Sequence, residues 1–147
     1  MSLTPIEARD EIQKAFNDAW QAGDPSEGIN SSLYSVDYQD IAFTVPATTV
    51  PWARVQIKNN DSNQASMGES GNRLFTRTGI VTVSLFTPLG DGLKLMYKLV
   101  KIVMGAYEGV HTTGGVWFRN VRFKEIGSDG SWFQVNVLAE FSYDEVK

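Results

Sequence analysis

The part of the chain that most restricts its fold runs from residue 71 to residue 106. Residues 73–86 are rich in β-branched and aromatic side chains and carry no charge beyond Arg73 and Arg77, a composition typical of a strand. A turn with proline and glycine follows at 87–92 and leads into an apolar segment, 93–107, with the periodicity of a helix. Apolar residues cover well over half of this helix, so we expect contacts on two sides, for example with the sheet and the first helix, or with a neighbouring subunit.

Composition sets the class of protein. The chain has 147 residues, of which 42% are hydrophobic, enough for one domain around a single core. Thirteen Lys and Arg against 17 Asp and Glu give a net charge of -4, which offers no footprint for tight nucleic-acid binding. The absence of cysteine excludes disulfides, thiolate metal ligands and a cysteine nucleophile. Because the first residues lack a secretory signal and no apolar stretch reaches about 18 residues, we expect a soluble, intracellular protein.

The first helix is predicted from its start signal. Thr4, Pro5 and Glu7 have the spacing of an N-cap, a proline at the first helical position and an acidic capping partner. One apolar stripe at helical spacing follows, formed by Ala8, Ile12, Ala15, Phe16 and Ala19. A Gly-Asp-Pro sequence should end this helix. Residues 26–37 are polar and turn-forming and predict a loop, whereas residues 38–45 predict a short strand.

Further strands are predicted from alternation. Residues 53–58 alternate between apolar and polar side chains, as expected for a strand with one wet face. Residues 59–72 are almost entirely polar, and we expect a long loop there that is mobile in the isolated protein. The strand at 73–86 should pair back across this loop as a hairpin. Two more strands are expected at 116–126 and 133–143, joined by a tight turn with two glycines.

The order of these elements indicates an α+β fold. We expect a mainly antiparallel sheet of four or five strands with two helices packed on one face, all within a single domain that spans residues 1–147. At about 25 cal/mol per Å2 of apolar surface buried, only the helix-covered face can be a dry core. The other face carries most of the polar strand residues and is left for solvent or for contact with a subunit.

Residues that could carry catalysis or metal binding are scarce. His111 is the only histidine and lies in a glycine- and threonine-rich turn without a carboxylate or serine at motif spacing, so we interpret it as a surface residue. The pair Asp144 and Glu145 is interpreted as solvated charges rather than as metal ligands. The turn at 87–92 lacks the Gly-Lys-Ser/Thr ending of a phosphate-binding loop and is interpreted as a strand-to-helix turn. We therefore predict no catalytic site, no metal and no cofactor.

Large aromatic residues leave two interpretations open. Trp52, close to Arg54, and Trp132 fall on strand faces opposite the apolar rows. These rings either cover the ends of the sheet locally or form a surface that contacts another protein. Arginine is suited to the second role, since its guanidinium makes bidentate contacts with carboxylates across an interface.

Several segments resemble a known protein family. The resemblance is carried by Trp-Ala-Arg-Val-Gln-Ile at 52–57, Gln-Ala-Ser-Met-Gly at 64–68, the strand at 73–88, and residues 116–123, 127–137 and 141–144. In these segments the chain resembles the tail terminator proteins of long-tailed bacteriophages, a group that includes related uncharacterised prophage proteins. The likeness extends over residues 6–143 and rests on packing and turn signatures rather than on a catalytic motif.

The resemblance implies a structural protein and not an enzyme. It implies an α+β fold that assembles as a hexameric ring on the finished tail tube, stops tube polymerisation and provides the surface to which the head is joined. The implied partners are further copies of the same chain, the tail tube protein and a head-tail joining protein. DNA only passes through the lumen, and neither a cofactor nor a membrane takes part. The implied location is the cytoplasm of the bacterial host during assembly, and then the virion tail.

The sequence also offers candidates for contact residues. Those at the interface with a neighbouring subunit or the tube are Trp52, Arg54, Gln64, Met67, Arg73 and Arg77. We expect residues 59–72 to become ordered against the tube or a neighbour, with ordering entropy offsetting part of the contact energy. Two other functions remain open: another neck or tail-tube-like protein of the same particle, or a small-ligand binding domain with a pocket between sheet and helices.

Overall fold

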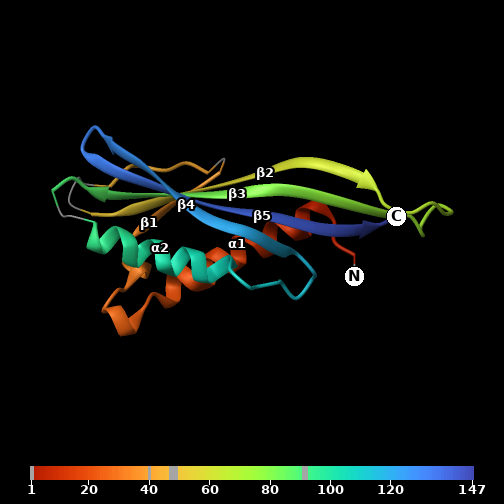
Figure 1. Ribbon diagram of the computed structural model, residues 1–147, viewed down its shortest axis with the longest axis horizontal. Helices are drawn as coiled ribbons and strands as arrows, with labels where there is room; N and C mark the ends of the chain where they lie inside the picture. Colours follow the sequence, from red (N-terminus) through yellow and green to blue (C-terminus); the bar gives the residue numbers. More distant parts are fainter. Residues whose placement is uncertain (1, 40, 47–49, 91–92) are drawn as a thin grey trace.

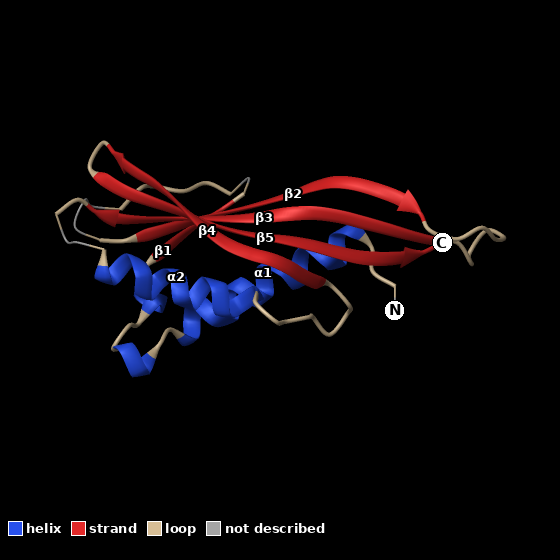
Figure 2. Cartoon of the chain, viewed as in Figure 1, coloured by secondary structure: helices blue, strands red, loops and turns tan. Residues whose placement is uncertain are grey.

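The molecule consists of a sheet with two helices on one of its faces (Figures 1 and 2). The computed structural model describes residues 2–39, 41–46, 50–90 and 93–147. In these residues the elements are α1 (Pro5–Ala22), two short 3-10 helices (Pro25–Glu27 and Ser31–Leu33), β1 (Ser35–Tyr38), β2 (Trp52–Gln64), β3 (Leu74–Pro88), α2 (Lys94–Tyr107), β4 (Trp117–Asp129) and β5 (Trp132–Val146). The predicted α+β class, with two helices on one face, is confirmed. None of the described helices combines the length and the apolar character needed to cross a membrane.

The sheet is mixed rather than purely antiparallel. Its strand order is β1-β2-β3-β5-β4, and every neighbouring pair is antiparallel except β1 and β2, which run parallel with Ser35 beside Trp52. β1 lies almost wholly within the predicted loop at 26–37. The strand predicted at 38–45 is wrong in its described part, since only Tyr38 belongs to a strand there, and residue 40 lies outside the described residues. The four residues of β1 alternate, but so short a pattern inside a polar, turn-forming stretch does not stand out as a strand.

The capping signal places the start of α1 correctly. The Glu7 amide donates to the Thr4 hydroxyl at 3.3 Å, and the Thr4 amide donates to the Glu7 carboxylate at 3.2 Å, which completes the capping box. The chain leaves the helix at Gly23 with a φ of 64°, a conformation that favours glycine. The buried stripe of the helix consists of Ala8, Ile12, Phe16 and Trp20. Local sequence therefore fixes both ends of α1.

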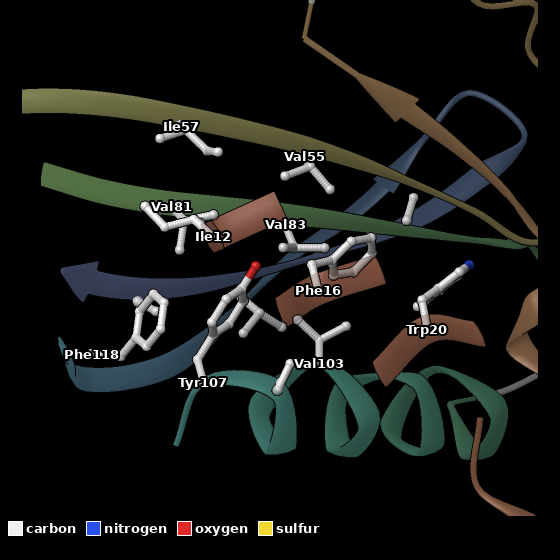
Figure 3. Packing of buried hydrophobic residues seen from close by; sticks show 14 of the residues in the cluster. Ile12, Phe16, Trp20, Val55, Ile57, Val81, Val83, Val103, Tyr107 and Phe118 are labelled. Atoms are coloured by element: carbon white, nitrogen blue, oxygen red, sulfur yellow. The ribbon is translucent and has the colours of Figure 1, made fainter. Parts of the chain in front are cut away.

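The core lies between the helices and the covered face of the sheet (Figure 3). Phe16 of α1 and Tyr107 of α2 lie among strand residues such as Val83, and all three are fully buried. Burial of each large apolar side chain is worth roughly 1.5–3 kcal/mol, so this layer drives folding. The Tyr107 hydroxyl has no hydrogen-bond partner among the described residues. Burial, with a further contribution from nearby Tyr38, strongly raises the pKa of Tyr107.

Three strands continue past the helices and form an arm (Figure 2). We define the arm as residues 59–64 of β2, 74–79 of β3 and 141–146 of β5, together with its tip, residues 65–73. The predicted loop at 59–72 is wrong over its first six residues, which pair with β3 from Asn59 opposite Gly79 to Gln64 opposite Phe75. Backbone pairing, rather than side-chain burial, holds this polar segment in place. Hydrophobic periodicity therefore carries no sign of it.

Gly79 marks the junction of the arm with the body of the sheet. A Cβ at this position would lie 2.2 Å from the carbonyl oxygen of Lys58 and 2.5 Å from the ring of Phe141, so a larger residue does not fit. β2 has a bulge opposite this point, between Asn59 and Asp61. A bulge bends its strand and increases the local twist. The close approach at Gly79 and the bulge thus occur together at the point where β2 changes from apolar to polar residues.

β4 forms one edge of the sheet and is also interrupted by a bulge. Asn120 has a φ of 52°, and the register with β5 shifts between residues 119 and 122. Before this bulge Phe118 faces the core, whereas Trp117 is 59% exposed. Trp117 and Phe123 therefore lie on opposite faces of the strand, because an inserted residue breaks the alternation within the strand expected at 116–126. The turn to β5 is also shorter than predicted, since β4 continues to Asp129.

Candidate interaction surfaces

The six candidate contact residues fall into two regions. Trp52 and Arg54 lie on the face of the sheet away from the helices, which we call the open face. The arm and its tip carry Gln64, Met67, Arg73 and Arg77. The structure does not bring the six residues together, so each region is a separate candidate surface.

Trp52 is buried although it lies on the open face. Its ring stacks on Phe86 with centroids 4.1 Å apart and on Phe43 at 5.3 Å, and Trp132 meets it edge-on at 6.2 Å. Only 3% of Trp52 is exposed. The ring therefore covers the end of the sheet, the first of the two interpretations. A partner cannot contact Trp52 directly, and this residue can only position the more exposed side chains around it.

Arg54 completes this aromatic cluster. Its guanidinium carbon lies 5.2 Å from the ring centroid of Trp52 and 5.7 Å from that of Phe86. Its Nε also donates to the Asp37 carboxylate of β1 at 2.9 Å. Cation–π contacts and the ion pair hold the side chain flat against the rings. Because 40% of the side chain remains exposed, Arg54 is a charged group of this cluster that a partner can reach.

Arg77 is bound within the arm. Its Nε and Nη2 donate to Glu145 Oε1 at 3.1 and 2.7 Å, and its Nη1 donates to the Ser62 hydroxyl at 2.7 Å. These bonds tie β2, β3 and β5 together. Glu145 is only 8% exposed, so the interpretation of Asp144 and Glu145 as a solvated pair is wrong for Glu145. Removing one member of such a pair leaves an unpaired charge, which makes Arg77 a stabilising residue of the arm.

The tip of the arm holds Met67 in the solvent. Met67 is 95% exposed. Close to it in sequence, the Leu74 amide donates to the Ser66 hydroxyl at 2.9 Å, and the Gln64 side chain donates to the Ser66 carbonyl at 3.0 Å. The Ala65 amide donates to the Leu74 carbonyl at 2.7 Å. These hydrogen bonds extend the β2-β3 pairing up to the residue before Met67.

Arg73 lies at the other side of the tip. Its amide donates to the Lys147 carbonyl at 3.3 Å, and the Lys147 amide donates to the Arg73 carbonyl at 2.9 Å. The β3-β5 pairing thus reaches the base of the tip. The Arg73 Nε is buried without a hydrogen-bond partner among the described residues.

A further surface, which sequence reasoning missed, lies between α2 and β4. It is a groove of about 480 Å3 lined by Tyr97, Val100, Lys101, Met104, Gly105, Glu108 and Phe123. Tyr97 and Phe123 meet edge-on with ring centroids 5.9 Å apart and are 45% and 41% exposed. The Tyr97 hydroxyl bonds to the Glu125 carboxylate, and this bond raises the pKa of Tyr97. The wide apolar stripe predicted at 93–107 was the available signal, because part of it faces this groove.

The other residues singled out in the sequence form no reactive cluster. His111 is exposed, as predicted, and stacks on Trp117 with centroids 4.5 Å apart. Across residues 2–39, 41–46, 50–90 and 93–147, no group of three or more His, Asp or Glu side chains could hold a metal ion. Of the predicted turn at 87–92, residues 91 and 92 lie outside the described residues.

Comparison with known proteins gives matches at the level of the fold. No protein family model and no curated protein matches this chain. Among solved structures, a protein that carries no functional name matches with a TM-score of 0.64 and 17% identity, over 96% of this chain and 96% of that chain. A chain from the virion of a native gene transfer agent particle matches with a TM-score of 0.50 and 13% identity, over 92% of this chain and 96% of that chain. At these identities the matches establish a shared fold over nearly the whole chain.

Proposed function

We propose that this chain is a structural protein of a phage or phage-like particle and acts there as a tail terminator. In this role a ring of copies caps the tail tube, stops its polymerisation and provides the surface to which the head is joined. The observation that carries the proposal is the fold match with a chain of the gene transfer agent virion, which covers 92% of this chain. The segments that resemble tail terminators support the same class of function.

The proposed role depends on docking and involves no reaction, metal or cofactor. A ring of identical chains needs a heterologous interface, in which two different surfaces of each copy meet. The open face, the arm and the groove beside α2 are distinct surfaces, enough for a neighbour on each side and for a further partner. We propose a hexamer that contacts the tail tube protein and a head-tail joining protein.

The proposal also includes a passage for DNA. The net charge of -4 fits a lumen that lets DNA slide, because phosphate contacts from many lysines would hold the strand. Assembly would take place in the cytoplasm of a bacterial host, away from membranes, and the finished protein would be part of the virion tail.

Loss of the gene tests the proposed function. In a strain that produces particles, we expect deletion of the gene to give overlong or headless tails in negative-stain images of lysates. The full gene supplied in trans should restore normal tails, and a variant with residues 62–69 deleted should fold but fail to do so. Tails of normal length joined to heads in the deletion strain would contradict the proposal.

A second candidate is another neck or tail-tube-like protein of the same particle. It is favoured by the same neighbour, whose name specifies a virion but no component. Filled heads without tubes in the deletion strain would indicate this function. Light scattering with purified tail tubes separates the two further: a terminator adds a fixed mass per tube end, whereas a tube-like protein continues to add mass.

A further inference from the structure

We propose that the tip of the arm in one copy docks into the groove between α2 and β4 of the next copy, with Met67 as the inserted side chain. The occupant of the groove is thus a second copy of this chain. The inference rests on the proposed function, in that a ring requires one repeated contact. It goes further by naming the two surfaces that make that contact.

The tip and the groove match in chemistry. Methionine is flexible and polarizable, and its sulfur makes favourable contacts with aromatic rings at about 5 Å. Tyr97 and Phe123 present two partly exposed rings to the groove, half-buried Met104 adds aliphatic surface, and Val100 lines the groove although it is only 3% exposed. Met67 is the counterpart, since nearly all of its side chain is exposed.

One pair of residues at the two surfaces has opposite charges. Glu69 lies two residues after Met67 in the tip, and Lys101 borders the groove with 62% of its side chain exposed. Within its own chain Lys101 is 3.3 Å from the Asp24 carboxylate and 3.8 Å from that of Glu27. The Asp24 side chain is only 16% exposed, whereas that of Lys101 stays accessible to the Glu69 carboxylate of a neighbour. Glu108 also lines the groove, so the charge contact is secondary to the apolar one.

A copy cannot fill its own groove. Pairing of β2, β3 and β5 and the bond between Arg77 and Glu145 hold the arm as a ribbon that leads away from α2 (Figure 1). The contact must therefore form between two copies. Because the donor and acceptor surfaces differ, each copy gives one arm and receives one, and such a repeated contact builds a ring when the rotation between neighbours closes.

Gly105 provides independent support for an occupant of the groove. It lies inside α2, where glycine is less favourable than alanine. A Cβ at this position would meet nothing within 4 Å among the described residues, and its φ is not positive, so no contact in the described part of the chain requires glycine. The space left by the missing side chain belongs to the groove. Docking of a neighbour would explain a residue that the monomer does not need.

Because the chain lacks cysteine, an introduced pair tests the contact directly. The variant Met67→Cys with Gly105→Cys is mildly oxidised, with and without purified tail tubes, and examined on non-reducing gels. We expect a ladder of disulfide-linked multimers. The control pairs Met67→Cys with Asn17→Cys, an exposed position on α1, and should give only low yields of cross-linked chains. Equal yields from the two pairs in both conditions would overturn the proposal.

A second experiment fills the groove. Gly105→Leu should reduce self-association measured by light scattering at least tenfold, with an unchanged circular dichroism spectrum. Gly105→Ala should raise the melting temperature and weaken association less. Undiminished association of a folded Gly105→Leu variant would overturn the proposal, and if this variant does not fold, the cysteine pair decides. Cross-linked rings that fail to cap tubes would contradict the proposed terminator function but not the contact between tip and groove. Capping of tubes without cross-links would contradict the contact but not the function.

Discussion

The body of the sheet and the arm are built from the same strands but are held by different interactions. In the body, β2, β3 and β5 bury one face against the helices, and Val55 and Val83 are at most 1% exposed. In the arm, β2 carries Asn, Asp and Ser residues and is held by backbone pairing and by the Arg77–Glu145 pair. Phe141 and Tyr143 of β5 still belong to the core at the base of the arm, and the register set there is continued into the polar half of β2.

The largest expected effect tests the dependence of the arm on the body. Phe16→Ala removes a fully buried ring that stacks on Trp20 at 5.4 Å. We expect the free energy of unfolding in urea to fall by about 3–5 kcal/mol. The buried apolar residues of the arm, Phe141 and Tyr143, belong to the same core as Phe16. The amides of the arm should therefore lose protection from hydrogen exchange together with those of the body. If the amides of the arm stayed protected while the body unfolded, the arm would not depend on the core of the body.

A smaller, local effect should follow loss of the ion pair. Arg77→Met removes the hydrogen bonds to the Glu145 carboxylate. A hydrogen bond to a charged group contributes about 1.5–3 kcal/mol to stability. Hydrogen exchange should accelerate at residues 59–64 while the amides at 81–85 keep their protection. The double variant Arg77→Met with Glu145→Leu should recover part of the loss, because no charge is left buried. Equal acceleration in both regions would show that the arm is not a separate unit.

The junction should respond to a single methyl group. Gly79→Ala places a Cβ against the Lys58 carbonyl and the Phe141 ring. We expect a loss of about 1–3 kcal/mol in urea unfolding, as found for overpacked sites. Thr78→Ala, one residue earlier on the open face, is the matched control and should cost less. The comparison would need revision if the two variants were equally stable.

The smallest effect at neutral pH concerns the body alone. Tyr107→Phe removes a hydroxyl that lacks a partner among the described residues, and stability should rise or stay within about 1 kcal/mol. Above pH 10 the two proteins should diverge. Since burial raises the pKa of Tyr107, the folded state keeps a proton that the unfolded chain loses. The wild type should therefore lose up to about 1.4 kcal/mol per pH unit relative to the variant. Parallel decline of both proteins in urea unfolding at rising pH would contradict this.

Sequence reasoning found the elements whose local signals agree with the fold. The capping residues Thr4 and Glu7 placed α1, and the alternation at 53–58 placed the body of β2. It missed β1, whose four residues are held by a parallel partner, and the polar half of β2, whose pairing depends on β3. Both misses have one cause: the stabilising contacts come from residues far away in the chain.

The candidate surfaces were predictable to a lesser degree. Met67 and Gln64 do lie at the end of the arm, but their role in contacts stays a prediction. The burial of Trp52 could not be read from its strand face, because it depends on the rings of Phe86 and Trp132, which lie far away in the sequence. In the sequence, the groove beside α2 was indicated only by the apolar stripe at 93–107, which is wider than packing against the sheet and α1 requires. Which part of that stripe stays open depends on the edge position of β4.

The place of β5 in the sheet has a consequence for the synthesis of the protein. β5 follows every other strand in the chain, yet it lies between β3 and β4. Until the ribosome releases β5, β4 has no strand to pair with, and the backbone N–H and C=O groups along one edge of β3 have no partners. Such edges recruit strands from other nascent chains. Productive folding in the cell therefore waits for the final strand, and premature termination just before it would yield an aggregating product rather than a shortened domain.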